Sequence, residues 1–396
     1  MSDVPRLLDW YAAGRLLRPD PAKAGTVHLA RALAALCGAS LTLNPPERQI
    51  AAAIGDAEHY VFVLADGLGL NLVDVLPPSS FLRKHGALEL ASTFPSSTAP
   101  ALTSIATGLW PAQHGVPAWL VYLRERGLHT VTLPFTERFS GRPLGEFRLE
   151  AGDLFTCPPL WAALPGDTML LLHQRIAGSA YTRYASGGRP ILPYTSLSSA
   201  VEAICSRVRS AAAPTFTYLY YSAVDTAVHA HGPGSRQVAA EVVELDERLD
   251  GLAQDLPENA RLVVSADHGG YDVGPRQKLL LRPDDELSSC LLTPPAGEPP
   301  TPLFHVRPGR EADFAATFRR TAGDAFVLLT PDEVEALRLL GPDLLSPTTR
   351  ARIGDFMALS AAGESVVYAP DTAIVNMKGF HGGLSPTEVR IPLILA

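Results

Sequence analysis

The chain contains 396 residues, of which 46% are hydrophobic and 19% are charged. This composition is typical of a folded, water-soluble protein and excludes a disordered chain, while the length allows one large domain with insertions or two to three units. The net charge is −8 and lysine and arginine form no basic block, which excludes charge-driven binding to a nucleic-acid polymer or an anionic membrane. An acidic protein that acts on an anionic substrate must supply positive charge locally, and bound metal ions are one common source.

Cysteines and apolar runs indicate the cellular compartment. Cys37, Cys157, Cys205 and Cys290 are scattered without a CxxC pair, which argues against a disulfide framework or a thiolate zinc site. The first residues lack the uninterrupted apolar run of a signal peptide, and no run reaches the ~18 apolar residues of a membrane span. We therefore expect a cytoplasmic protein without a membrane partner, while the sequence leaves the oligomeric state open.

The first strong strand signal is the apolar run 61–65, which follows a mostly helical segment over residues 1–55. A continuous apolar run of this kind predicts a parallel strand that is buried on both faces. Asp66 comes directly after it. Because ligands bind at the carboxyl ends of strands in open α/β sheets, Asp66 is a candidate functional residue.

Thr98 is the next candidate, because it stands at the expected start of a helix. It is followed by Pro100 and by a small and apolar run, so it should be the N-cap or the first helical residue. Its hydroxyl would then lie at the positive end of the helix dipole, where an alkoxide or a phosphoryl oxygen is favoured. Taken alone, Thr98 is equally compatible with an ordinary capping threonine.

Two further core strands follow, each with polar residues after its end. Residues 215–221 are β-branched and aromatic, residues 261–265 are apolar, and an amphipathic helix over 236–256 separates them. This alternation predicts an α/β/α sandwich with a mostly parallel central sheet. The terminal run 391–395 should be a closing strand, which Pro392 would confine to a sheet edge or to the start of a strand.

The segment 271–365 has a different character, with proline-rich loops between short helices and strands. We interpret it as an inserted α+β subdomain at the rim of the site, with residues 1–270 and 366–396 forming the catalytic core. The stretch 179–193, rich in Gly, Ser, Tyr and Arg, reads as a surface loop with Arg183 or Arg189 as substrate contacts, although loop arginines are usually only solvated.

Four separated segments present side chains that bind hard or borderline metals, three of them at or just beyond strand ends. Each of these residues alone has an ordinary explanation as a turn, interface or loop residue, but their joint placement favours a common site. Three carboxylates and three imidazoles make two sets of three ligands, and each set leaves room for substrate or water. Two ions about 4 Å apart can hold both oxygens of a phosphoryl displacement and can activate a coordinated hydroxyl, for which Thr98 is the candidate. The six residues are Asp66, Asp225, His229, Asp267, His268 and His381.

The ordered segments VFVLADGLG, TAPALTSIATG, PAQHG, AVDTAVHAHGP, VVSADHGG and GFHGG resemble the alkaline phosphatase superfamily. The resemblance is to its branch of type I phosphodiesterases and nucleotide pyrophosphatases, with phosphonoacetate hydrolase as a close cousin. It implies two divalent ions, with zinc expected first and manganese as the alternative. The implied ligand sets are Asp225, His229 and His381 for one ion, and Asp66, Asp267 and His268 for the other.

The resemblance also implies that Thr98 is the nucleophile, because it stands nine residues before the pair Thr107 and Gly108 as in the family motif. Thr93, in the sequence TFP, is the rival, but its distance to that pair is wrong. A phosphothreonine intermediate would form on Thr98, and water would then hydrolyse it.

One position departs from the family pattern. Where the phosphodiesterase branch places an asparagine that binds a phosphoryl oxygen, this chain has Trp119. The backbone amide of Ala99 is a possible substitute donor. Trp119 itself is either a core residue or a stacking surface for a nucleobase or aryl group. This departure leaves the preference for diester, monoester or phosphonate open.

These observations predict a metal-dependent hydrolase of small phosphate esters or nucleotides, first of all a phosphodiesterase or nucleotide pyrophosphatase. The enzyme alternatives are a phosphonoacetate hydrolase-like phosphonatase and a phosphomonoesterase. A threonine nucleophile disfavours a sulfatase, and the ligand set disfavours a cofactor-independent phosphoglycerate mutase. From another class, a catalytically silent binding protein on the same fold remains an alternative, although all seven site positions are intact.

Overall fold

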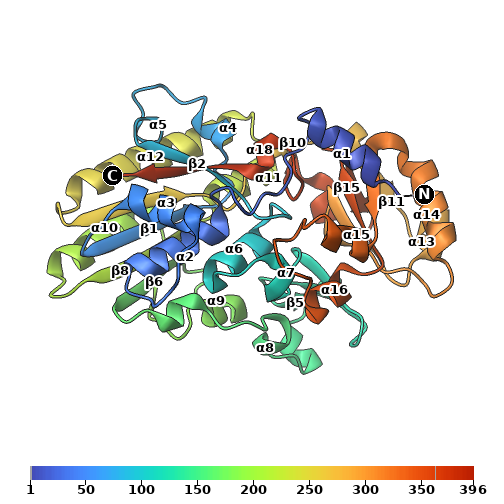
Figure 1. The fold of residues 1–396 in the computed structure, drawn as a ribbon, viewed down its shortest axis with the longest axis horizontal. Helices are drawn as coiled ribbons and strands as arrows, with labels where there is room; N and C mark the ends of the chain where they lie inside the picture. The colour runs from blue at the N-terminus through green and yellow to red at the C-terminus, as the bar shows by residue number, and fades with distance from the viewer. Residues whose placement is uncertain (1, 362) are drawn as a thin grey trace.

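The computed structural model describes residues 2–361 and 363–396. Figure 1 shows two sheets side by side, with the central sheet on the left and the second sheet on the right. The central sheet has the strand order β2 (Gly86–Ala91), β18 (Arg390–Leu395), β9 (Ala260–Ser265), β1 (His59–Ala65), β8 (Thr215–Tyr221), β6 (Asp167–His173) and β7 (Ile191–Tyr194).

The three predicted core strands lie next to one another in this sheet. β1 pairs in parallel with β8 on one side and with β9 on the other. Every residue of β1 and β8 is buried, as expected for strands without polar alternation. Their carboxyl ends therefore meet at one edge of the sheet. The predicted mostly parallel α/β fold is confirmed.

The strand β18 differs from its prediction. It lies between β2 and β9 and runs antiparallel to both, so it is not an edge strand. Pro392 is tolerated because the pairing with β9 begins only at Leu393, and Pro392 uses its carbonyl to accept a hydrogen bond from the hydroxyl of Ser265. The proline thus precedes the pairing with β9, while it lies opposite Glu89 within the pairing with β2.

Helices cover both faces of the central sheet (Figure 1). α10 and α12 pack against each other, while α2, α3 and α6 form a separate group. α12 closely matches the predicted helix 236–256: Ser235 caps its start, and five apolar residues at helical spacing are buried. The helices that form these layers are α2 (Thr26–Leu36), α3 (Pro45–Ile54), α6 (Thr98–Thr107), α10 (Leu197–Ser210) and α12 (Arg236–Asp255).

The second sheet draws strands from two distant parts of the chain. The hairpin strands β3–β5 pair with the segment 296–360 through a contact of Gly297 with Leu120. The boundaries at residues 271 and 365 stay a prediction. The strands, in sheet order, are β14 (Phe326–Leu329), β15 (Phe356–Ser360), β13 (Thr301–Phe304), β12 (Ala296–Glu298), β3 (Leu120–Leu123), β4 (Leu128–Val131) and β5 (Thr136–Glu137).

The remaining elements are short apart from α1, α11 and α14. Two small sheets pair β10 with β17 and β11 with β16. These strands are β10 (Tyr271–Asp272), β17 (Gly379–Phe380), β11 (Lys278–Leu281) and β16 (Ser365–Tyr368). The helices are α1 (Val4–Ala12), α4 (Leu70–Val73), α5 (Phe81–Lys84), α7 (Pro111–His114), α8 (Ala151–Leu154), α9 (Ala180–Ala185), α11 (Ala223–His231), α13 (Glu286–Cys290), α14 (Glu311–Ala322), α15 (Pro331–Ala336), α16 (Pro347–Ile353), α17 (Thr372–Asn376) and α18 (Pro386–Val389), with 3-10 turns η1 (Leu144–Phe147), η2 (Leu160–Ala163), η3 (Pro275–Gln277) and η4 (Gly323–Ala325).

The stretch 179–193 is not the predicted loop. It forms the helix α9 and the strand β7, and the hydroxyl of Ser179 caps α9 by accepting the amide of Thr182. Arg183 donates to the carbonyl of Gly178, and Arg189 donates to that of Trp161. Both arginines are thus engaged by the main chain. The expectation of a loop was wrong, while substrate contacts of this stretch stay a prediction.

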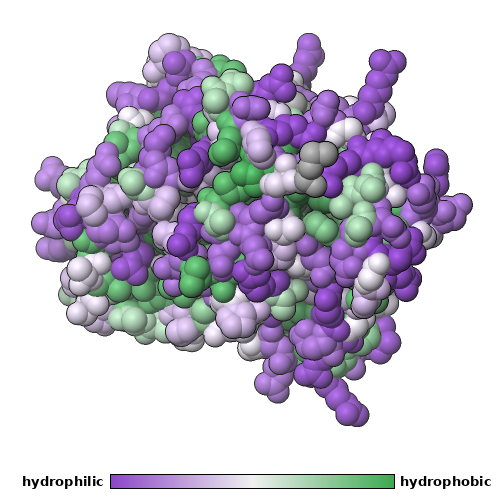
Figure 2. Space-filling model, turned by 45° about the vertical axis from the view of Figure 1, so that its right-hand side comes forward, coloured by the Kyte–Doolittle hydropathy of each residue, from purple (hydrophilic) through white to green (hydrophobic). Residues whose placement is uncertain are grey.

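The face in Figure 2 is mostly hydrophilic, with apolar residues in small groups. Across residues 2–361 and 363–396, the structure contains no helix with the length and hydropathy needed to span a bilayer.

Candidate active site

The six predicted ligands meet at the carboxyl edge of the central sheet. Asp66 follows β1, Asp225 and His229 lie one helical turn apart on α11, and the remaining three follow β9 and β17. Within this group, Asp66, Asp267 and His268 bring ligand atoms within 4.8 Å of one another, and so do Asp225, His268 and His381. The structure thus assembles in space what the sequence separates by more than three hundred residues.

The distances within the group link its members into one cluster. The Nε2 atom of His268 lies 3.5 Å from Asp66 Oδ1 and 3.4 Å from Asp267 Oδ2. The Nε2 atom of His229 lies 3.2 Å from Asp225 Oδ2 and 3.2 Å from His381 Nε2. His268 thus lies beside Asp66 and Asp267, and it also belongs to the group with Asp225 and His381. The predicted sets assign it to one ion only, and the division of ligands between two ions stays a prediction.

All three histidines are oriented by the main chain. Nδ1 of His229 lies 2.9 Å from the carbonyl of Gly379, Nδ1 of His268 lies 2.9 Å from that of Gly269, and Nδ1 of His381 lies 3.1 Å from that of Ser96. A carbonyl only accepts, so each Nδ1 carries the proton and donates. This fixes the tautomer whose Nε2 lone pair faces the cluster, as in metal-ligating histidines.

The three aspartates each present one unsatisfied oxygen. Asp66 Oδ1, Asp225 Oδ1 and Asp267 Oδ2 are buried and have no hydrogen-bond donor. Buried carboxylate oxygens are normally paired, because desolvation without a partner is costly. Three such oxygens beside three Nε2 atoms form a donor set that suits zinc or manganese, so the residues present fit divalent metal ions.

The pKa shifts follow from this crowding. Burial and the neighbouring carboxylates of Asp267 and Asp225 raise the pKa of Asp66 well above its ordinary value. Burial alone would lower the pKa of His229, but the carboxylate of Asp225 outweighs it and raises that pKa to about 9. Burial and the adjacent His268 hold the pKa of His381 well below its ordinary value. The buried carboxylates of the cluster thus repel one another, and a bound cation would offset this repulsion.

A glycine allows these segments to approach. Gly67 has φ +75°, and a side-chain carbon there would stand 2.9 Å from the Cβ of Asp225. Its amide donates to Asp267 Oδ1 at 3.0 Å. The Asp-Gly pair after β1 therefore brings α11 and the end of β9 together, which no other residue type could do without displacement.

Thr98 is the first residue of α6 and points into the cluster. Its Oγ1 lies 3.1 Å from His268 Nε2, and the residue is buried. Thr93 lies in the preceding loop; it is also buried, its hydroxyl has no partner, and it does not line the cavity beside the cluster. Of the two rival threonines, the structure places Thr98 next to the ligands.

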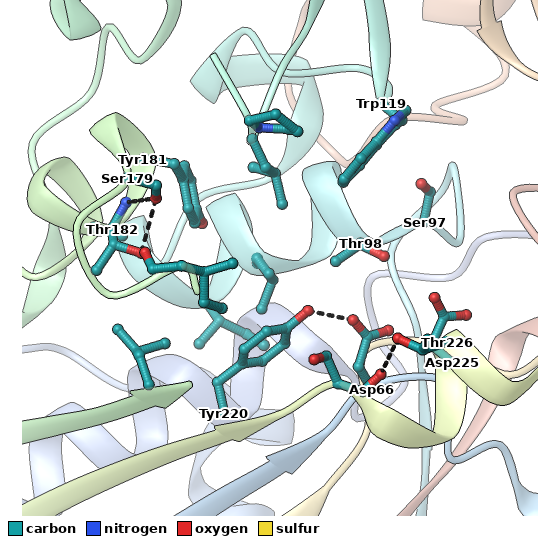
Figure 3. A pocket seen from close by; sticks show the side chains of 18 of the residues that line it. Asp66, Ser97, Thr98, Trp119, Ser179, Tyr181, Thr182, Tyr220, Asp225 and Thr226 are labelled. Atoms are coloured by element: carbon teal, nitrogen blue, oxygen red, sulfur yellow. Dashed lines mark hydrogen bonds between the residues drawn. The ribbon is translucent and has the colours of Figure 1, made fainter. Parts of the chain in front are cut away.

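Ala99 and Trp119 also lie at this end of α6. Ala99 is the second residue of the helix, where backbone amides have no partner within the helix and are free to bind an anion. Trp119 is half-buried, packs against the core at its inner side and lines the cavity near Thr98 (Figure 3). Trp119 is therefore in part a core residue, and its role as a stacking surface stays a prediction.

Sequence reasoning missed two residues of the site. Tyr220 on β8 donates its hydroxyl to Asp66 Oδ2, and Glu298 on β12 accepts from Ser97 Oγ and from the amide of Trp119, both at 2.6 Å. Burial raises the pKa of Glu298 to about 7, although the bonds from Ser97 and Trp119 act in the opposite direction. The sequence of β8 does not indicate that the hydroxyl of Tyr220 binds Asp66. Glu298 was missed because it reaches the site from the second sheet.

The profile of the type I phosphodiesterase/nucleotide pyrophosphatase family matches residues 60–384. The chain belongs to this family. Membership confirms the resemblance predicted from the six motifs and makes the protein a phosphoester hydrolase of a metal-dependent family. At the sequence level, no curated protein matches the chain.

Solved structures of the family and its relatives share the fold. Murine ectonucleotide pyrophosphatase/phosphodiesterase 5 is 17% identical, with a TM-score of 0.63 over 84% of this chain and 87% of that chain. The human protein of the same name is 16% identical, with a TM-score of 0.62 over 85% and 87%. Phosphonoacetate hydrolase from Sinorhizobium meliloti, in complex with phosphonoacetate, is 19% identical, with a TM-score of 0.59 over 85% and 89%. At these identities the likeness establishes the fold alone.

Proposed function

We propose that this family member hydrolyses phosphodiesters or nucleotide pyrophosphates with two divalent metal ions, zinc first and manganese as the alternative, through a phosphothreonine on Thr98. The observation that carries this proposal is the 3.1 Å approach of Thr98 Oγ1 to His268 inside a group of three imidazoles and three carboxylates, of which only His229 is not fully buried.

The six clustered side chains would hold the ions, with the hydroxyl of Thr98 beside them. Bound there, the ions would act as Lewis acids that neutralise the phosphoryl oxygens and lower the pKa of a neighbouring hydroxyl. The backbone carbonyls behind the three histidines keep each Nε2 aimed at the cluster, and Tyr220 holds Asp66 in place.

The chain's own residues define two displacement steps. In the first, Thr98 Oγ1 loses its proton and forms a bond to phosphorus, while the ester bond to the leaving group breaks and the leaving oxygen takes up a proton. In the second, a water oxygen bonds to phosphorus, the bond to Thr98 breaks, and the hydroxyl of Thr98 is restored. The first-turn amide of Ala99 is oriented to donate to a phosphoryl oxygen in both steps.

The comparisons support a threonine nucleophile and a nucleotide-like substrate. An inactive threonine-to-alanine variant of the murine protein has been solved in complex with AMP. Loss of activity through that substitution is what a threonine nucleophile requires. For this chain, the corresponding role falls to Thr98 on its own geometry.

Phosphonoacetate is the second candidate substrate, because the Sinorhizobium meliloti structure was solved with it. It carries a carboxylate beside the phosphonate, so a site for it needs an additional positive group. Apart from histidines, Arg175 is the only cationic side chain among the described residues that line the cavity, and it is exposed. The cavity therefore favours a diester over phosphonoacetate. A catalytically silent binding protein is disfavoured because the cluster and its threonine are complete.

Metal analysis combined with turnover tests the proposal. Inductively coupled plasma measurements on purified protein should find zinc or manganese at about two ions per chain, and bis-p-nitrophenyl phosphate should be hydrolysed. Protein that contains neither metal near stoichiometry and fails to hydrolyse this diester after loading with either ion would contradict it. Faster phosphate release from phosphonoacetate than hydrolysis of the diester would favour the second candidate.

A further inference from the structure

The ligand cluster forms one end of a cavity of about 540 Å³. Asp66, Thr98 and Asp225 border it at that end. Figure 3 shows the cavity between α6 and the central sheet, with Thr98 and Asp66 at one end and Tyr181 of α9 at the other. Its size is that of a pocket for a small molecule, much more than a phosphoryl group needs.

One face of α6 carries both the proposed nucleophile and the cavity wall. Thr98, Leu102, Ile105 and Ala106 follow the spacing i, i+4, i+7 and i+8, so they project from the same stripe of the helix, and all four line the cavity. With a rise of 1.5 Å per residue, this stripe extends about 12 Å from Thr98 to Ala106. A substituent on a phosphate held at Thr98 would therefore run along an apolar surface.

The opposite wall has the same character. Leu170 and Leu172 on β6, with Tyr218 and Tyr220 on β8, alternate along their strands and so present one face of the sheet to the cavity. All four side chains are buried. The hydroxyl of Tyr220 is engaged by Asp66, which leaves the aromatic ring as the contacting surface.

At the far end Ser179 and Thr182 are already bonded within the protein, whereas the buried hydroxyl of Tyr181 has no partner among the described residues. Thr182 Oγ1 donates to the carbonyl of Ile176 at 2.9 Å, and Ser179 Oγ donates to Thr182 Oγ1 at 3.0 Å. A nucleobase in this position could pair with the hydroxyl of Tyr181 but would bury its other donors and acceptors against carbon, and each unpaired group is costly. A hydrocarbon incurs no such cost and gains from leaving water.

We infer that this cavity binds an aliphatic chain esterified to the reacting phosphate, so that the preferred substrates are alkyl phosphodiesters rather than nucleotides. The inference rests on the proposed function, because it places the reacting phosphate at Thr98. It narrows the substrate class through the walls of the cavity, which lie outside the ligand cluster.

Binding of alkylphosphonates to the metal-loaded protein tests the inference without requiring turnover. Calorimetric dissociation constants would be measured for methyl-, butyl- and octylphosphonate and for AMP. Affinity should rise with chain length by up to about fourfold per methylene until the cavity is filled, and octylphosphonate should bind more tightly than AMP. Equal affinity across the series, or tighter binding of AMP than of octylphosphonate, would overturn the inference.

Filling the deep end of the cavity provides the matched variants. Ala106→Leu on α6 and Ala185→Leu on α9 add the same volume from opposite sides, and both alanines line the cavity. Each variant should lose the gain in affinity from butyl- to octylphosphonate. Ala240→Leu, the same change at an exposed position of α12, should keep the full dependence on chain length. Melting temperature and metal content identify any variant that fails to fold. If one of the two cavity-filling variants fails to fold, the other one tests the inference.

The two proposals fail in different ways. Protein that binds alkylphosphonates by chain length but does not hydrolyse bis-p-nitrophenyl phosphate would refute the proposed function and leave the cavity assignment standing. Protein that hydrolyses the diester but shows no dependence on chain length, in wild type as in the filled variants, would refute the cavity assignment alone.

Discussion

The ligand cluster and the apolar cavity share the helix α6 but have opposite chemistry. The cluster concentrates carboxylates and imidazoles around Thr98, whereas the cavity wall beyond Leu102 is mainly carbon. The cluster is built from the helix α11 and from loops after strands, while the wall is built from the faces of a helix and two strands. This difference separates two properties: changes in the cluster should affect every substrate, and changes in the wall should affect only the choice between substrates.

Removal of the metals should have the largest effect and should spare no substrate. Chelation should abolish turnover of all phosphate esters and lower the melting temperature, because the clustered carboxylates then repel one another without a cation. Activity assays and thermal unfolding before and after chelation, followed by reloading with zinc or manganese, measure both effects. Undiminished activity of protein shown to be free of metal would contradict the claim that the cluster acts on every substrate through bound metal.

The loss of stability on metal removal should also depend on pH. Asp66 has a raised pKa in the folded state. Its ionisation therefore destabilises the stripped protein as the pH rises above the pKa that this carboxyl has in the unfolded chain. His229 has a raised pKa of about 9, so the stability that its protonated form adds is lost as pH rises above its unfolded value toward 9. The lowered pKa of His381 has the opposite sign but acts only below about pH 6.5, the pKa of an unperturbed histidine, so the gap in melting temperature between loaded and stripped protein should widen from about pH 6.5 to about pH 8. A constant gap would contradict this assignment of charges.

Replacing the nucleophile should have the next largest effect. Thr98→Ala should lower kcat by about 10³-fold or more for every substrate, because it removes the hydroxyl on which the covalent intermediate forms. The metal content should remain. Thr93→Ala is the matched control, since it removes a buried hydroxyl that has no hydrogen-bond partner. Comparable losses in the two variants would remove Thr98 from its proposed role.

Much of this arrangement could be predicted from the sequence, because its signals are local. Apolar runs revealed β1, β8 and β9, and the polar residues after them marked the ligands. The helix beginning at Thr98 was equally clear. In each case, the residues that specify the element are adjacent or one turn apart.

The rest depends on contacts between distant segments. The interior position of β18 is decided by pairing with β2 and β9, which its own residues do not encode. Similarly, α9 was hidden by a Gly- and Ser-rich composition, although the serine that caps it was visible. Glu298 comes to Ser97 only because the second sheet joins strands from residues 120–137 and 296–360. The cavity also could not be predicted, since it exists between elements.

The support of Asp66 by Tyr220 should have an intermediate effect. Tyr220→Phe removes the hydroxyl that donates to Asp66 but keeps the ring that lines the cavity. Loss of such a partner behind a metal ligand typically costs about 10- to 100-fold in metal affinity or activity. Metal titration monitored by calorimetry measures this. The response to alkyl chain length should stay as in wild type. A changed response would contradict the claim that the ligand cluster and the cavity wall control separate properties.

Glu298 should have the smallest effect on catalysis. Glu298→Gln keeps an acceptor for Ser97 and Trp119, so turnover should change by less than about tenfold, whereas Glu298→Ala leaves two buried donors unpaired and should cost about 1–3 kcal/mol of unfolding free energy. Burial raises the pKa of this carboxyl to about 7, so its ionisation costs stability as pH rises toward that value. Thermal unfolding should therefore show Glu298→Gln gaining stability relative to wild type from about pH 5 to about pH 8. A relative loss over that range would reverse the assigned direction.

A crystallographic anomalous-scattering map of the metal-loaded protein tests the central claim most directly. With data collected at the zinc or manganese absorption edge, the account predicts two peaks among Asp66, Asp225, His229, Asp267, His268 and His381, with the oxygen of Thr98 directed toward them. A map with no peak among these six side chains, or with its metals bound elsewhere on the chain, would contradict it.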